Sequence, residues 1–195
     1  GNITNMDELK NSLQENGAIF HSTTDSEIIT YQIALERTKT NSIEEAVYET
    51  TRKIKGGFAL IIMSPQKMIG VRDPYGLKPL CLGKRNGSYI LASESCALNA
   101  VGAEFVRDIL PGEIITIQIN DIKNNYALCN QTHAHCIFEY IYFARLDSTM
   151  DGINIYDARV RAGEALAKSY PVEADLVVGV PDSGLDAALG FSQAS

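Results

Sequence analysis

Apolar residues near the beginning of the chain recur every three or four positions, which is the spacing of one helix face. The clearest series begins after Asn5, a candidate helix cap, and is ended by Gly17. Two further helices are predicted, one from about Asp25 and one from Ser42, which can form a capping-box pair with Glu45. The first part of the chain is therefore predicted to be mainly helical.

The middle of the chain has the pattern of antiparallel strands. Asn86–Gly87 is the strongest short signal for a hairpin, and residues 113–120 alternate as expected for a strand with one buried face. The expected strands are 58–63, 68–72, 80–84, 88–93 and 113–120, with a short strand at 18–20 and a short helix at 96–101. This order predicts an α+β fold, such as a layered αββα arrangement.

The pattern changes again after about residue 145. Asp157 is expected to cap a helix, and residues 175–180 form a continuous apolar run. Such a run predicts a strand that is buried on both faces of a parallel sheet. The loop 181–184 and a helix over 185–191 would then complete half of a βαβ unit. We therefore predict two domains, an α+β domain over 1–145 and the start of an α/β domain over 146–195.

Composition and charge exclude several classes of protein. The 195 residues carry a net charge of −7, and the isoelectric point is about 5.0, so broad binding to nucleic acid or to an anionic membrane is not expected. No apolar run approaches the roughly 20 residues that span a bilayer, and no signal peptide is recognisable. The four cysteines show no CxxC spacing, which favours reduced thiols and a cytoplasmic protein.

Two polar segments admit either a structural or a functional interpretation. Asp25 lies at a predicted helix start, where it either interacts with the helix dipole or receives an ammonium group. Ser183 follows the predicted strand at 175–180 and is either a helix cap or part of a site for phosphate at a helix N-terminus. The residues alone do not decide between these alternatives.

Several motifs, taken in order, resemble class II glutamine amidotransferase domains. They are Gly1–Asn5, Thr23–Glu27, Arg72–Leu80, Ala92–Ala97 and Pro111–Glu113. The later motifs are similar to those of the glutamine phosphoribosylpyrophosphate amidotransferases, which begin de novo purine synthesis. They are Cys136–Ser148, Asp151–Asn154 and Val178–Ser183. The resemblance covers essentially the whole chain.

The resemblance implies a fold and a reaction. The fold is an N-terminal-nucleophile (Ntn hydrolase) amidotransferase domain, followed by a type I phosphoribosyltransferase domain. In that family an N-terminal cysteine attacks the carboxamide of glutamine, with its own α-amine as the base. The released ammonia displaces pyrophosphate from phosphoribosylpyrophosphate and gives phosphoribosylamine. The implied enzyme is a glycosyltransferase, more narrowly a pentosyltransferase, with glutamine amidotransferase activity.

The resemblance also implies roles for individual residues. Gly1 matches a glycine whose backbone N–H belongs to the oxyanion hole, and Asp25 matches the aspartate that holds the α-ammonium of glutamine. Pro181, Asp182 and Ser183 match a loop that binds pyrophosphate, with Ser183 near Mg²⁺. Magnesium is accordingly an expected cofactor.

Other matched residues are expected to be structural, or leave two interpretations open. Arg72–Leu80 and Glu94 resemble the framework of the family, and Leu146 replaces a proline of its usual Arg-Pro-Asp-Ser motif. Cys136 stands where some members carry one of four cysteine ligands of a [4Fe–4S] cluster. It is either such an iron-sulfur ligand or a plain thiol.

No cysteine of this chain matches the catalytic nucleophile. We therefore expect the 195 residues alone to be inactive and prone to aggregation, and the complete parent to be the enzyme. The implied partners are glutamine, phosphoribosylpyrophosphate, inhibitory purine nucleotides and further copies of the same chain, with no nucleic acid and no membrane. The alternatives are another class II glutamine amidotransferase, such as a glucosamine-phosphate or asparagine synthase, or a non-catalytic relative.

Overall fold

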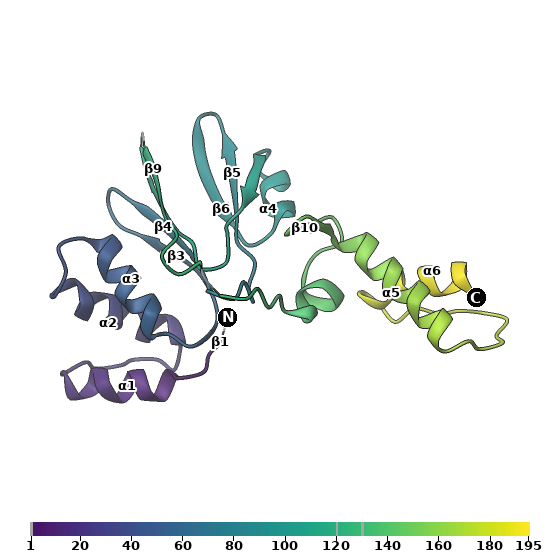
Figure 1. Ribbon diagram of the computed structural model, residues 1–195, viewed down its shortest axis with the longest axis horizontal. Helices are drawn as coiled ribbons and strands as arrows, with labels where there is room; N and C mark the ends of the chain where they lie inside the picture. Colours follow the sequence, from purple (N-terminus) through teal and green to yellow (C-terminus); the bar gives the residue numbers. More distant parts are fainter. Residues whose placement is uncertain (1, 120, 130) are drawn as a thin grey trace. The chain divides into compact units, whose positions relative to one another are not determined.

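The computed structural model describes residues 2–119, 121–129 and 131–195. The chain forms two compact units. Figure 1 labels many of the helices and strands that make them up. Unit 1 consists of residues 1–78 and 109–134, and unit 2 consists of residues 79–108 and 135–195. Each unit therefore combines two segments that are separated in the sequence.

Unit 1 contains three helices and an antiparallel sheet of four strands in the order β3-β4-β8-β9. Its helices are α1 (Met6–Glu15), α2 (Asp25–Arg37) and α3 (Ile43–Lys53). The sheet strands are β3 (Ala59–Met63), β4 (Met68–Arg72), β8 (Ile114–Gln118) and β9 (Asp121–Asn125). The short strands β1 (Asn2–Ile3) and β2 (Gly56–Gly57) pair with each other.

The core of unit 1 lies between the three helices and one face of this sheet. Leu13 of α1, Ile28 of α2 and Val47 of α3 are buried in one cluster with Ile69 and Val71 of β4. The apolar positions that predicted the helices are therefore the ones that pack on the sheet. Ser42 caps α3 as expected, since its side chain accepts a hydrogen bond from the Glu45 N–H at 3.1 Å.

Three local predictions for unit 1 are wrong. The Asn5 side chain does not cap α1, because it bonds the backbone of Lys53 and Lys55 at 2.9 Å each. Residues 18–20 are not a strand, since they pair with no strand in the described part of the chain. Strand β8 is buried on both faces rather than one, because it lies in the middle of the sheet and Ile114 and Ile115, which face opposite ways, are both covered.

Unit 2 contains an antiparallel sheet of three strands in the order β6-β5-β7. Its elements are β5 (Cys81–Arg85), β6 (Ser88–Ala92), α4 (Ser95–Ala100), β7 (Glu104–Asp108), the π-helix η1 (Glu139–Phe143), β10 (Thr149–Met150), β11 (Ile153–Asn154), α5 (Ile155–Ser169) and α6 (Gly184–Ala194). The predicted hairpin turn is confirmed: Asn86 and Gly87 have φ angles of 48° and 83°, as a type I′ turn requires.

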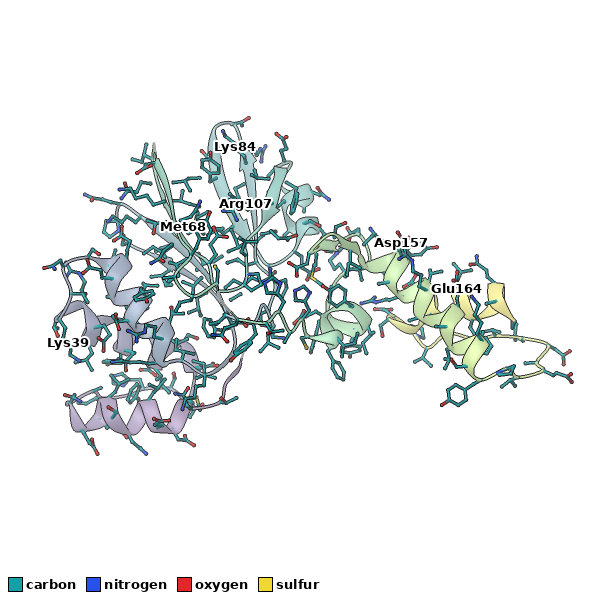
Figure 2. The ribbon with its side chains drawn as sticks, viewed as in Figure 1. Lys39, Met68, Lys84, Arg107, Asp157 and Glu164 are labelled. Carbon is teal, nitrogen blue, oxygen red and sulfur yellow. The ribbon has the colours of Figure 1, made fainter. Side chains whose placement is uncertain are left out.

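Helices α5 and α6 pack closely because glycines remove side chains from their contact. A Cβ atom on Gly163 of α5 would overlap the backbone carbonyl of Ala187. A Cβ atom on Gly190 of α6 would overlap the carbonyl of Val160. Figure 2 shows α5 with Asp157 in its first turn and Glu164 further along the helix.

Two predictions for unit 2 are wrong. Residues 175–180 form no strand, and Leu176, Val178 and Val180 are each more than three-quarters exposed. A strand needs a hydrogen-bonded neighbour, and no described segment pairs with these residues. Helix α5 is capped by Asn154 rather than Asp157: the Asn154 side chain accepts a hydrogen bond from the Asp157 N–H at 3.1 Å. None of the described helices has both the length and the apolar character that crossing a bilayer requires.

Candidate functional site

Asp25, the predicted ligand of an α-ammonium group, is the first residue of α2 in unit 1. Its side chain is half-buried and makes no hydrogen bond or ion pair with any residue that the structure describes. The carboxylate therefore remains available as an acceptor. Gly1, the other residue predicted for this site, lies outside the described residues.

The loop that precedes Asp25 is held by Glu27, a role that the sequence analysis did not predict. The Glu27 carboxylate accepts the backbone N–H groups of His21 and Ser22 at 2.9 and 2.8 Å, and the Ser22 hydroxyl at 2.6 Å. The hydrogen bond from the His21 N–H, followed by the one from the Ser22 side chain, lowers the pKa of the Glu27 carboxyl. Glu27 thus fixes the loop from which α2 and Asp25 begin.

The segment 72–80 is organised around two buried charged residues. The Asp73 carboxylate accepts the N–H groups of Tyr75, Leu77 and Lys78 at 3.1, 3.0 and 3.0 Å. The Arg72 guanidinium donates to the carbonyl oxygens of Lys78 at 2.9 Å and Ile109 at 2.7 Å. These charges are used to hold backbone, which fits the framework role expected for this segment.

A pocket of about 530 Å³ in unit 2 contains the predicted pyrophosphate loop. It is lined by Tyr142, Ala144, Arg145, Leu146, Asp147, Arg159, Asp182 and Ser183. Ser183 precedes α6, yet its hydroxyl makes no capping hydrogen bond to the helix. The hydroxyl and the exposed Asp182 carboxylate are therefore available to a ligand. Pro181 lies in the same loop, and the peptide bond between Pro181 and Asp182 is cis.

The turn at 145–148 forms another side of this pocket. Arg145 donates to the Asp147 carboxylate at 3.0 Å, and this hydrogen bond lowers the pKa of the Asp147 carboxyl. The Ser148 hydroxyl and the Arg145 backbone N–H donate to Oε2 of Glu94 at 2.8 and 2.9 Å. The Ser95 hydroxyl accepts the N–H of Thr149 at 2.8 Å. Glu94 therefore holds the turn in place, in keeping with its expected framework role.

The described residues do not form a metal cluster site by themselves. No group of three or more His, Cys, Asp or Glu side chains capable of holding a metal occurs among them. Cys136 is half-buried and supplies a single thiol, so the [4Fe–4S] ligand role finds no partner ligands in the described part of the chain. Burial raises the pKa of the Cys81 thiol to about 12, which keeps it protonated and unreactive.

The site residues predicted from the sequence belong to different units of the structure. Asp25 belongs to unit 1, whereas the loop 181–183 and Cys136 belong to unit 2. Within unit 2 the structure brings Asp182 and Ser183 into one pocket with Arg145 and Asp147. Arg159 lines the same pocket and is 5% exposed. It was not predicted as a site residue, because nothing adjacent to it in the sequence indicates a site.

Comparison with known proteins identifies the class of protein. A family model described as a glutamine amidotransferase domain matches residues 1–100. The chain therefore belongs to the glutamine amidotransferase domain family.

The curated relatives that the chain resembles are amidophosphoribosyltransferases. The one from Methanocaldococcus jannaschii is 45% identical over 210 residues, which cover 100% of this chain and 45% of the relative. The one from Archaeoglobus fulgidus is 40% identical over 100% of this chain and 43% of the relative. The one from Staphylococcus aureus is 45% identical over 99% of this chain and 39% of the relative. The chain thus spans less than half the length of these relatives.

Solved structures give the same result for the fold. A glutamine phosphoribosylpyrophosphate amidotransferase from B. subtilis, complexed with ADP and GMP, matches with a TM-score of 0.93 and 38% identity over 99% of this chain and 42% of that one. A structure described as the allosteric regulatory enzyme of purine biosynthesis matches with a TM-score of 0.94 and 37% identity over 100% of this chain and 41% of that one. The predicted α+β fold of the N-terminal-nucleophile amidotransferase class is confirmed.

Proposed function

We propose that this chain is part of an amidophosphoribosyltransferase that catalyses the first step of de novo purine synthesis. The complete enzyme hydrolyses glutamine to glutamate and ammonia. The ammonia then displaces pyrophosphate from phosphoribosylpyrophosphate to give 5-phosphoribosylamine. The observation that carries the proposal is the likeness to amidophosphoribosyltransferases over the whole chain, which includes both the Asp25 segment and the loop 181–183.

In this proposal, Asp25 binds the α-ammonium group of glutamine. A fixed carboxylate at this position distinguishes an amino acid from a simple amide, because a charge-assisted hydrogen bond forms only with the ammonium. The carboxylate has no partner among the described residues, and Glu27 fixes the loop before it. The backbone N–H of Gly1 and a cysteine nucleophile outside this chain would complete the glutaminase site.

The loop 181–183 is proposed to bind the pyrophosphate of phosphoribosylpyrophosphate. The loop leads into the N-terminus of α6, whose helix dipole favours an anion, and the Ser183 hydroxyl is available beside it. Ser183 and Asp182 carry oxygen atoms of the kind that magnesium prefers, with the phosphate oxygens as further ligands. Magnesium, when bound, would offset the negative charge of the pyrophosphate as it leaves.

The remaining parts of the proposal rest on the relatives. Purine nucleotides are proposed as inhibitors, because the B. subtilis neighbour is described as complexed with ADP and GMP. A homo-oligomer and a cytoplasmic location follow from the proposed role in purine synthesis. The domain boundary at 145/146 and the iron-sulfur role of Cys136 stay predictions. We also propose that the isolated 195 residues are inactive.

The proposed role of Asp25 is tested by Asp25→Asn in the complete protein. The KM for glutamine should rise at least about tenfold, since a charge-assisted hydrogen bond contributes about 1.5–3 kcal/mol. The rate with ammonia as the nitrogen source should not change, because ammonia bypasses the glutamine site. Asp7→Asn serves as the matched control: Asp7 is an exposed acidic residue in the first turn of the neighbouring helix α1.

Equal loss of the glutamine-dependent and ammonia-dependent rates in Asp25→Asn would show that Asp25 is structural. An unchanged KM for glutamine would show that another group binds the ammonium. If the unmodified protein makes no phosphoribosylamine from either nitrogen source, the proposed function itself is wrong.

A further inference from the structure

The π-helix η1 ends where its hydrogen-bond pattern is interrupted by Glu94. In a π-helix each N–H donates to the carbonyl five residues earlier, as the Ala144 N–H does to the Glu139 carbonyl at 2.9 Å. The next N–H, that of Arg145, would bond the Tyr140 carbonyl. It donates instead to Oε2 of Glu94 at 2.9 Å. The Arg145 N–H therefore departs from the π-helical pattern.

Arg159 of α5 donates to backbone carbonyls at this end of the π-helix. Its Nε donates to the Tyr140 carbonyl at 2.9 Å, and its Nη2 donates to the Ala144 carbonyl at 2.8 Å. One guanidinium therefore bonds two carbonyl oxygens at the end of the π-helix. Glu94 and Arg159 therefore hold two adjacent residues through different backbone groups. The Glu94 carboxylate accepts a hydrogen bond from the Arg145 N–H, and the Arg159 guanidinium donates one to the Ala144 carbonyl.

This same segment is a wall of the pocket that contains the loop 181–183. Ala144, Arg145 and Arg159 all line it, together with Asp182 and Ser183. Arg159 is 5% exposed, and it forms no ion pair with a carboxylate among the described residues. Because no carboxylate in the described part of the chain is paired with Arg159, its positive charge adds to the local potential at the pocket and favours an anionic ligand.

We propose that Arg159 is a positioning residue for the phosphorylated substrate, because it fixes the Ala144–Arg145 wall of the pocket that holds Asp182 and Ser183. The proposal rests on the proposed function, which supplies the substrate. Arginine is needed at this position because its planar fork donates from two nitrogen atoms at once. Lysine keeps the charge but has a carbon atom at the position of Nε, so it cannot donate from both positions that Arg159 uses.

The test compares Arg159→Lys with Arg161→Lys in the complete protein. Arg161 is an exposed residue of the same helix, which makes it a matched control. In hydrogen–deuterium exchange, the peptide covering 139–148 should exchange about two- to tenfold faster in Arg159→Lys, because one of the two hydrogen bonds is lost. Arg161→Lys should exchange like the unmodified protein.

Kinetics with ammonia as the nitrogen source give the second readout. The KM for phosphoribosylpyrophosphate should rise about two- to tenfold in Arg159→Lys, through the loss of the same hydrogen bond, with a smaller change in kcat. In a separate assay with glutamine as the nitrogen source, the KM for glutamine should stay unchanged, since Asp25 belongs to unit 1. A general loss of folded enzyme would instead lower kcat for both nitrogen sources and leave both KM values unchanged.

Two outcomes would overturn the proposal. Equal exchange of 139–148 in the two variants would show that Arg159 does not hold the π-helix end. Faster exchange with an unchanged KM for phosphoribosylpyrophosphate would show that this wall does not serve the substrate. If the unmodified protein has no ammonia-dependent activity, the proposed function fails, and the exchange comparison still decides whether Arg159 positions the wall.

Discussion

Both units contain a buried arginine whose guanidinium donates to backbone carbonyl oxygens. Arg72 of unit 1 bonds the carbonyls of Lys78, Ile109 and Gly76 and is 2% exposed. Arg159 of unit 2 bonds two carbonyls and is 5% exposed. The difference lies in their surroundings: Arg72 organises a loop next to the buried carboxylate of Asp73, whereas Arg159 lines a pocket.

The comparison shows that burial and backbone hydrogen bonds do not by themselves distinguish a framework arginine from one that serves a site. What distinguishes Arg159 is that the backbone it holds is also a pocket wall. Substitution should accordingly separate stability from function. Loss of Arg72 should act mainly on folding, and a conservative change of Arg159 should act on substrate binding.

The largest expected effect is a loss of stability when either buried arginine is replaced by methionine. Arg72→Met should lower the free energy of unfolding by about 3–5 kcal/mol, because each buried carbonyl left without a donor costs about 1–3 kcal/mol. Arg159→Met leaves fewer carbonyls without a donor and should cost about 2–3 kcal/mol. Urea denaturation followed by circular dichroism measures both. A larger loss for Arg159→Met than for Arg72→Met would contradict the comparison.

A smaller loss of stability is expected from a substitution that pushes α5, the helix that carries Arg159, away from α6. Gly163→Ala should lower the free energy of unfolding by about 2–3 kcal/mol, since the added Cβ overlaps the carbonyl of Ala187. Gly184→Ala is the control, because its Cβ would meet only Val180, at an ordinary 3.8 Å. Thermal melting should place Gly184→Ala close to the unmodified protein. Equal melting temperatures for both variants would show that α5 and α6 do not depend on this contact.

The smallest expected effect is the pH dependence of the loop that precedes Asp25. The pKa of Glu27 is lowered in the folded protein from its ordinary value of 4.5. Its stabilising contribution is therefore complete above pH 4.5 and is lost as the pH falls through the lower, folded pKa. Backbone NMR of His21 and Ser22 should show one transition with a midpoint below 4.5, absent in Glu27→Gln. A midpoint above 4.5 would reverse the sign of the argument.

Features that depend on neighbouring residues were predictable from the sequence. The hairpin at Asn86–Gly87 follows from two residues that accept positive φ angles, and the Ser42 cap follows from its spacing to Glu45. The run 175–180 was predicted wrongly because an apolar pattern indicates that a strand is suitable, not that a partner strand is present. Pairing is a non-local property.

In the candidate site, too, the features that depend on residues far apart in the sequence were not predictable. The resemblance identified the loop 181–183, and the structure places Asp182 and Ser183 in a pocket. The framework role of Glu94 was expected from the resemblance, but its partners and the role of Arg159 were not predictable, because both side chains act on backbone atoms far away in the sequence. Glu94 and Arg145 are 51 positions apart, and only folding brings them together. Glu27 was missed for a different reason, since a glutamate in the first turn of a helix has an ordinary explanation in the helix dipole.

The proposed function is tested most directly by measuring the products that the complete protein forms from glutamine and phosphoribosylpyrophosphate. Glutamate and pyrophosphate should be released in equal amounts, because each ammonia from glutamine displaces one pyrophosphate. Release of glutamate without pyrophosphate would contradict the proposal that the complete protein couples a glutaminase site to a phosphoribosyl site.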